Sequence, residues 1–445
     1  MKRRKTVRRR GIGRRAFIVG GLAGSGLLLR SLATGLPPSF LVNPARAQVP
    51  DALPQTLVLA TSAAGDPVNA NCPGSYVAGA QHPDAFAMPV PMTLGGQPTE
   101  AAAPWAELPE ALRRRMAFVH HATRSPAHTD YRSTMGLHGS VRSTSTNAGD
   151  MFASMIAGLS TAVLAGTPQT TLQPEPLPLT AEDLTYGGRP LQTVAPSQLA
   201  ALFAPPDGEV APLLNLRPLR DQALERVYRV LRDDGTAAQR AFVDRYIRSS
   251  EQARQLGEGL GAELAALQVA DDDLDGAAHQ LATAAILAAA RVAPVMTVKI
   301  PFGGDNHQDA DLAIETAETI SGVAAIGGFW NALVAAGIQD DVTFGLLNVF
   351  GRRLTRNTTG GRDHNRHHGV MVAFGPRVQG GVYGAVEMVN GAALSQPLPG
   401  ADGGEIVPDN SLEAVGTSLG IALGHDPEAI GQQITGGRLI DGFLA

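Results

Sequence analysis

The stretch at residues 360–369 reads GGRDHNRHHG and places one carboxylate and three imidazoles within six residues. Apolar runs at residues 342–347 and 370–374 lie on either side, and their length and continuity predict buried strands. The motif is therefore expected on a loop at a sheet end, where glycine lets the backbone fold around an ion. Carboxylate oxygen and neutral imidazole nitrogen are ligands of divalent cations such as zinc or manganese. The candidate ligands are Asp363, His364, His367 and His368, and the alternative is a turn aspartate beside surface imidazoles.

A second Asp-His pair lies about sixty residues earlier in the chain. Asp305 and His307 follow the strand-like run at residues 295–300 and precede a long helical segment at residues 309–337. Active sites of open α/β sheets lie where the carboxyl ends of the strands meet. Two strand ends that each supply Asp and His at one edge therefore predict a shared site.

Helices and strands alternate along much of the chain. Further strands are predicted at residues 56–60 and 116–121, further helices at residues 150–159, 276–290 and 411–423, and a glycine-rich hairpin at residues 375–384. This order predicts an α/β fold whose large, mostly parallel central sheet is flanked by helices. Residues 48–445 are expected to form one such domain, with a proline-rich segment at residues 168–206 and a helical excursion at residues 217–267.

The first 47 residues predict an export signal. Residues 1–15 contain nine basic side chains and no acid, and Arg14-Arg15 begins a twin-arginine pattern followed by an apolar run at residues 16–29. That run is shorter than the roughly 20 residues that span a bilayer, and Ala45-Arg46-Ala47 resembles a cleavage site. A basic nucleic-acid arm and a membrane anchor are the alternatives. We expect recognition by the twin-arginine export machinery, a periplasmic or extracellular location, and no stable membrane span after cleavage.

The charge after that cleavage argues against nucleic-acid binding. Eleven of the 36 basic residues and none of the 41 acidic residues lie in residues 1–47, so residues 48–445 have a formal net charge of −16. Nucleic-acid affinity depends on a basic surface that displaces counterions. An anionic substrate would have to be attracted locally, by a metal or by arginines. Cys72 is the single cysteine and is expected to be a buried structural thiol.

Two further polar residues follow predicted strands. Asp66 comes after the strand at residues 56–60 and is either a third metal carboxylate or an ordinary turn residue. His128 lies on the loop after the strand at residues 116–121 and is a candidate for substrate binding or catalysis. His120 and His121, at the end of that strand, are either functional or hydrogen-bonded to the backbone.

The order of these motifs resembles a known family. The twin-arginine signal, the first strand with Asp66, the His128 loop, GGDNH at residues 303–307, FGR at residues 350–352, the Asp363 loop and GGVYG at residues 380–384 are similar to exported proteins of the domain of unknown function 1501 family. That family lies within the alkaline-phosphatase and sulfatase-like superfamily. Three stretches differ from the family pattern: Asp305-Asn306-His307 stands for Asp-Thr-His, residues 348–352 lack its Ser-Glu pair, and Ala127-His128-Thr129 stands for Ser-His-Phe.

The resemblance implies two divalent ions, with zinc, manganese and calcium as candidates. Asp66, Asp363 and His364 would hold one ion, and Asp305, His307 and His367 or His368 the other. Arg352 is the candidate anion-binding group, because a planar guanidinium matches a tetrahedral anion, with a structural ion pair as its alternative. The implied function is hydrolysis of a small anionic phosphate or sulfate ester. The replaced Ser and Glu leave a non-catalytic envelope protein that binds glycans or a partner as the alternative, with transition-metal storage as a third.

Overall fold

The computed structural model describes residues 55–136, 151–165, 175–180, 184–186, 189–203, 275–290 and 292–445, with a few isolated positions between 226 and 236. The predicted export signal at residues 1–47 lies outside the described residues. The same holds for parts of the proline-rich segment at residues 168–206 and for nearly all of the helical excursion at residues 217–267.

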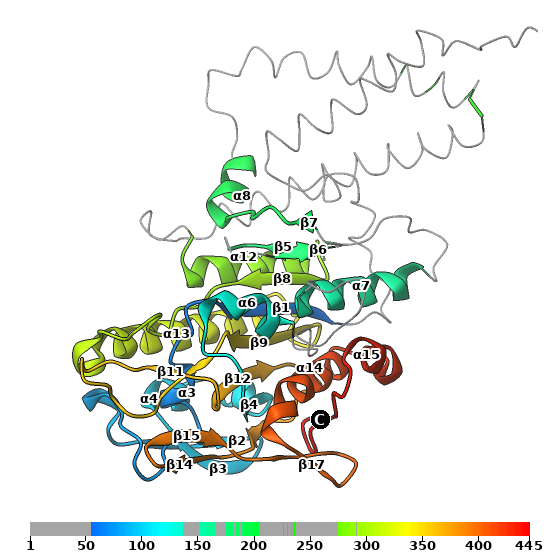
Figure 1. The fold of residues 1–445 in the computed structure, drawn as a ribbon. Coiled ribbons are helices and arrows are strands. Elements are labelled where there is room, and N and C mark those ends of the chain that lie inside the picture. Colours follow the sequence, from blue (N-terminus) through cyan, green and yellow to red (C-terminus); the bar gives the residue numbers. More distant parts are fainter. Residues whose placement is uncertain are drawn as a thin grey trace, which may run out of the picture.

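A seven-stranded sheet forms the centre of the described chain, in the order β13-β4-β12-β9-β1-β8-β5 (Figure 1). Its strands are β1 (Thr56–Ser62), β4 (Met116–His121), β5 (Leu177–Pro178), β8 (Val295–Val298), β9 (Val342–Asn348), β12 (Gly369–Phe374) and β13 (Gly381–Tyr383). Neighbouring strands are parallel except at β12, which runs antiparallel to both β4 and β9. The predicted α/β fold with a large, mostly parallel sheet is confirmed.

The direction of β12 decides which loops meet. β1, β4, β8 and β9 all end at one edge of the sheet, and β12, because it is antiparallel, begins there. The loops after β1, β4 and β8 therefore meet the loop before β12. We call this the site edge, and the polar residues predicted from sequence all follow or precede strands at it.

Helices cover both faces of the sheet (Figure 1). One face is covered by α4 (Ala103–Ala106), α5 (Glu110–Arg113), α8 (Pro196–Phe203), α12 (Ala277–Ala289) and α13 (Ala313–Ala335), and the other by α6 (Tyr131–Met135), α7 (Phe152–Ala165), α14 (Ser411–Ala422) and α15 (Pro427–Gln433). Side chains alternate between the two faces, as the two-residue period of a strand requires. Val58 packs with the first set of helices, for example, and Leu57 with the second.

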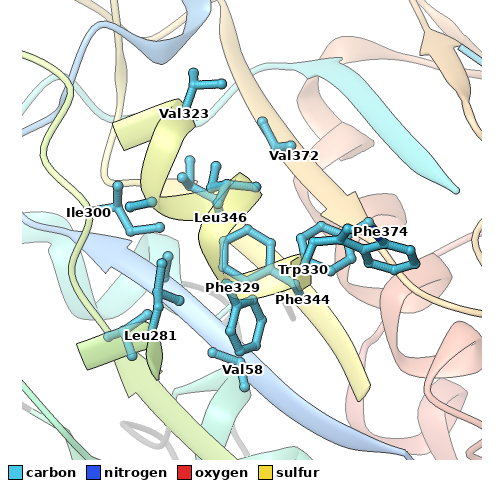
Figure 2. Close-up of a cluster of buried hydrophobic side chains, with 14 of the residues drawn as sticks. Val58, Leu281, Ile300, Val323, Phe329, Trp330, Phe344, Leu346, Val372 and Phe374 are labelled. Atoms are coloured by element: carbon cyan, nitrogen blue, oxygen red, sulfur yellow. The ribbon is translucent and has the colours of Figure 1, made fainter. Parts of the chain in front are cut away.

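The core on the α13 face is aromatic. Phe344 of β9 and Phe374 of β12 stack with ring centroids 4.9 Å apart, and Phe329 of α13 packs against both (Figure 2). Each buried aromatic or large aliphatic side chain of this kind contributes roughly 1.5–3 kcal/mol by leaving water. This packing fixes the strands whose ends form the site edge.

Short elements complete the described chain. They are α3 (Val68–Asn71), the 3₁₀ turns at Asp84–Phe86, His128–Asp130, Ala310–Leu312 and Pro408–Asn410, and the two-stranded pairs β2 (Val90–Leu94) with β3 (Gln97–Ala101), β6 (Thr185–Tyr186) with β7 (Arg189–Pro190), β10 (Gly351–Arg352) with β11 (His364–Asn365), β14 (Val386–Val389) with β15 (Ala392–Ser395), and β16 (Leu398–Pro399) with β17 (Glu405–Ile406). The β10–β11 pair matters most here, because it aligns Arg352 opposite His364 at the site edge.

The predicted strands at residues 56–60, 116–121, 295–300, 342–347 and 370–374 are confirmed within two residues at either end. The predicted hairpin at residues 375–384 is wrong. After β12 the chain passes the residues before β4, where Gly380 N donates to Arg114 O, and β13 then adds to the central sheet parallel to β4. Among the described residues, no helix is both long enough and apolar enough to cross a membrane.

Candidate metal centre

Three imidazoles converge at the site edge around one carboxylate. The Nε2 atom of His128 lies 3.4 Å from Asp305 Oδ2, and the Nε2 atoms of His307 and His364 lie 3.4 and 3.5 Å from Asp305 Oδ1. His128, Asp305 and His364 offer ligand atoms that all lie within 4.8 Å of one another. The structure thus brings together four residues predicted as site residues, from the loops after β4 and β8 and the loop before β12.

Backbone carbonyls determine the tautomer of two of these imidazoles. His128 Nδ1 lies 2.7 Å from Ala63 O, and His364 Nδ1 lies 2.5 Å from Pro126 O. A carbonyl oxygen can only accept, so in each neutral ring we assign the proton to Nδ1. The Nε2 atom of each ring is then an unprotonated lone pair that faces Asp305.

The third imidazole is oriented by a carboxylate. His307 Nδ1 lies 3.3 Å from Asp363 Oδ1, which also accepts a hydrogen bond of 3.0 Å from Asn357 Nδ2. Mainly because of the bond from Asn357, and also because of His307, the pKa of Asp363 is below its ordinary value. A carboxylate behind an imidazole fixes the ring and raises the basicity of its other nitrogen, an arrangement common behind metal-binding histidines.

The central carboxylate rests on a buried arginine. Arg352 is fully buried and donates to Asp305 Oδ1 at 2.8 Å, to Gly65 O at 2.5 Å and to Ala64 O at 2.7 Å. Burial alone would raise the pKa of Asp305, but the hydrogen bond and charge of Arg352 outweigh it and the pKa is lowered. Arg352 was a candidate anion-binding group, and its alternative was a structural ion pair. The structure places its guanidinium beneath Asp305, tied to the loop after β1.

The ring of Phe350 packs against two of the three imidazoles. Its ring stacks on His364 with centroids 4.1 Å apart and meets the edge of His128 at 4.9 Å. Burial is the first cause that lowers the pKa of His364, with the nearby Arg352 charge adding to it. A neutral imidazole at neutral pH is the form that binds metal ions.

A fully buried ion pair that the sequence does not predict holds two of the contributing loops together. Arg362 donates from Nε to Glu315 Oε2 at 2.7 Å and from a terminal nitrogen to Oε1 at 3.0 Å. Glu315 also accepts from Asn71 at 2.7 Å and from Asn306 at 2.9 Å. The pair therefore fixes the segments next to Asp305 and His364. Arg362 stands inside the quoted motif, but no sequence signal identifies a partner on α13.

Several predicted ligands lie elsewhere. Asp66 is buried, and its Oδ1 accepts the backbone N–H groups of Phe302 and Gly304, each at 2.8 Å. His367 is exposed, and its Nε2 accepts from Arg366 Nε at 3.1 Å. Within the described residues, neither side chain forms a hydrogen bond or ion pair with the four converging residues. The structure therefore does not bring Asp66 together with Asp363 and His364, the three residues expected to hold one ion.

His368 belongs to a chain of buried hydrogen bonds. Asn69 Nδ2 lies 3.1 Å from His368 Nδ1, His368 Nε2 lies 2.9 Å from His120 Nδ1, and His120 Nε2 lies 2.9 Å from Pro73 O. These partners assign donor and acceptor roles that leave both rings neutral. Burial lowers the pKa of His120 to about 4 and that of His368 well below its ordinary value. Both ring nitrogens of His368 are thus engaged away from Asp305.

Comparison with known proteins finds a similarity to one family over part of the chain and indicates no activity. A family profile described as "Protein of unknown function (DUF1501)" matches residues 214–402. The matched range includes Asp305, His307, Asp363 and His364, and it leaves His128 outside. A search of curated proteins returned no match.

Proposed function

We propose that this protein is an exported, divalent-metal-dependent hydrolase of phosphate or sulfate esters whose metal is held by His128, Asp305, His307 and His364. The observation that carries the proposal is the orientation of the three imidazoles, each with Nδ1 on an acceptor and Nε2 toward one carboxylate. Three neutral imidazoles and a carboxylate are a ligand set that zinc accepts, and manganese is a second candidate.

The donor set fits a cation on electrostatic grounds. His307 Nε2 and His364 Nε2 lie 2.8 Å apart, although the partners of both Nδ1 atoms assign a lone pair to each Nε2. Two facing lone pairs repel each other unless a positive species lies between them. Calcium fits less well, because it favours oxygen ligands.

A bound divalent metal would supply Lewis acidity toward an ester oxygen and toward the attacking group. The chain's own residues prepare for it. Arg352 favours the ionised form of Asp305, Asp363 orients His307, and Phe350 stacks on the ring of His364. The twin-arginine export route, the periplasmic or extracellular location, and membership of the alkaline-phosphatase and sulfatase-like superfamily are part of the proposal, supported by residues 1–47 and by the motif order.

Metal content and turnover test the proposal together. Elemental analysis of the folded chain should find a divalent metal that Asp305→Asn removes, and hydrolysis of an aryl phosphate or an aryl sulfate should disappear with it. Asp402→Asn is the matched control, because Asp402 also pairs with an arginine, Arg438, but at the surface. Metal and turnover that both persist in Asp305→Asn would refute the proposal.

A second candidate function is non-catalytic binding in the cell envelope, of a glycan or a protein partner. It is favoured by the engagement of Arg352, whose guanidinium is buried and shared among backbone carbonyls and Asp305, so that it does not reach an external anion. Metal bound at Asp305 without turnover of either ester would support this candidate. Saturable turnover of either ester would exclude it.

A further inference from the structure

A short turn at residues 357–361 lies against the loop that carries His307. Asn357 N donates to Gly361 O at 2.8 Å, and Gly360 N donates to Asn357 O at 3.2 Å. Thr359 Oγ1, on the same turn, lies 2.5 Å from the carbonyl oxygen of His307. The turn is thus closed on itself and docked on the backbone of His307, which gives the side chain of Asn357 a defined place.

The amide of Asn357 joins the two segments that supply His307 and Asp363. Its Nδ2 atom donates to Asp363 Oδ1 at 3.0 Å and to His307 O at 3.1 Å. An amide nitrogen has two hydrogens, so both are used. The backbone N–H of Thr359 donates to Asn357 Oδ1 at 3.0 Å, which assigns the oxygen and nitrogen ends of the amide.

The oxygen of Asp363 that Asn357 binds is also the one that faces the His307 ring. His307 Nδ1 lies 3.3 Å from Asp363 Oδ1. The Asp363 side chain is 44% exposed, and within the described residues only Asn357 and His307 donate side-chain hydrogen bonds to it. Asn357 is therefore the group that keeps this half-exposed carboxylate turned toward the ring.

We propose that Asn357 is a positioning residue of the candidate metal centre, which holds the Asp363 carboxylate behind His307 so that His307 Nε2 faces Asp305. Its second hydrogen bond, to His307 O, anchors the amide on the same loop. Asn357 acts only through Asp363 and has no contact of its own with Asp305. The inference rests on the proposed metal centre but does not depend on hydrolysis.

Zinc affinity in a double-mutant cycle tests this route. Asn357→Ala should weaken zinc binding about 10–100-fold in the parent protein, the range found for groups behind metal-binding histidines. In an Asp363→Ala background the same change should cost less than about threefold, because the carboxylate that Asn357 holds is already gone. Competition with a chromophoric chelator measures the four affinities on the full folded chain.

A second amide serves as the matched control. Gln280 also joins two segments, since its Nε2 donates to Asp275 O at 2.6 Å and its Oε1 accepts from Lys299 N at 2.8 Å, but it does not touch the centre. Gln280→Ala should keep the zinc affinity of the parent within about threefold in both backgrounds. If Asn357→Ala does not fold, Asn357→Asp replaces it in the cycle, because aspartate keeps the shape and the acceptor for Thr359 N but lacks both donors.

The outcomes separate this inference from the proposed function. A large loss in the parent background and a small one in Asp363→Ala would support it. Zinc bound equally well by the parent and by Asn357→Ala would overturn it and leave the metal centre standing. An equal loss in both backgrounds would also overturn it, since Asn357 would then act only on the loop. A parent protein that binds no zinc would refute the metal centre and this inference together.

Discussion

His307 Nε2 lies 2.8 Å from His364 Nε2, and the two rings reach this contact from positions 57 residues apart in the chain. Each ring is held from behind by an oxygen, the Asp363 carboxylate for His307 and the Pro126 carbonyl for His364. The contact is therefore imposed by the fold and not by attraction between the rings. Metal affinity should depend on the groups behind the rings as well as on the rings themselves.

Asp363→Asn should weaken zinc binding about 10–100-fold, because an amide orients His307 less firmly than a carboxylate and does not raise its basicity. Competition titration with a chromophoric chelator measures the affinity. Asp311→Asn is the matched control, since Asp311 is exposed and has a positive φ of 59° that asparagine tolerates. Equal zinc affinity in the parent protein and in Asp363→Asn would show that Asp363 does not support the site.

Glu315→Gln should destabilise the protein by about 3–5 kcal/mol, because it leaves the guanidinium of Arg362 buried without its counter-charge. Urea unfolding with EDTA present measures this change in free energy independently of metal. Glu428→Gln, at an exposed position of α15, should change stability by less than about 0.5 kcal/mol. A similar small change for both variants would show that the buried pair is dispensable.

Gly361→Ala should separate the two ligand loops. A methyl group at this position would lie 2.0 Å from Asn306 O and 2.5 Å from His307 O, both of them backbone atoms. The loop that carries His307 would have to move, so zinc affinity should fall by at least about tenfold along with stability. Gly328→Ala in α13 meets no atom within 4 Å and should instead stabilise the helix by about 0.5–1 kcal/mol. Unchanged zinc affinity in Gly361→Ala would contradict the close approach of the loops.

Stability without metal should fall as the pH falls from about 6.5 toward 4. Burial lowers the pKa of His120 and of His121 to about 4 in the folded protein, while in the unfolded chain both have ordinary values near 6.5. Between these values the unfolded state binds more protons, so the free energy of unfolding rises with pH by about 1.4 kcal/mol per unit for each such histidine. Urea unfolding with EDTA at pH 7 and pH 5 measures the slope.

His120→Gln tests the assignment of that slope. Glutamine does not titrate in this range and keeps an N–H donor for Pro73 O. The free energy of unfolding should therefore depend less steeply on pH, by about the contribution of one histidine. His367→Gln is the control, because His367 is exposed and its replacement should leave the slope unchanged. A slope that is equally steep in the parent protein and in His120→Gln would contradict the burial argument.

The sequence predicted most of the sheet, and its candidate residues include the four that converge at the site edge. Apolar runs such as residues 342–347 and 370–374 identified strands, because a strand buried on both faces has an unbroken apolar pattern. They did not identify β12 as antiparallel, since direction depends on the connection and not on composition.

Histidines that are neighbours in the sequence do not all become ligands of the same site. His364, His367 and His368 lie within five positions, but only His364 faces Asp305, because β11 and the start of β12 turn successive side chains to different sides. The sequence indicated His128 as a substrate-binding or catalytic candidate, and the structure places its Nε2 atom 3.4 Å from Asp305 Oδ2, among the candidate metal ligands. The partners of Arg352 and Arg362 could not be predicted from the sequence. Both guanidiniums bond to backbone atoms and to side chains that lie far away in the chain, and no sequence pattern marks such partners.

The antiparallel course of β12 also sets an order of events. Asp305 and the three imidazoles around it come from positions 128 to 364, and the loops that carry them are positioned by a sheet in which β12 lies between β4 and β9. Three of them, Asp305, His307 and His364, lie within residues 305–364, but His128 comes from the loop after β4, so under our proposal a chain in which β12 has not yet paired with β4 lacks the complete ligand set. Acquisition of the ion would then report the last stage of folding, and the compartment in which that stage is reached would decide which metal the protein carries.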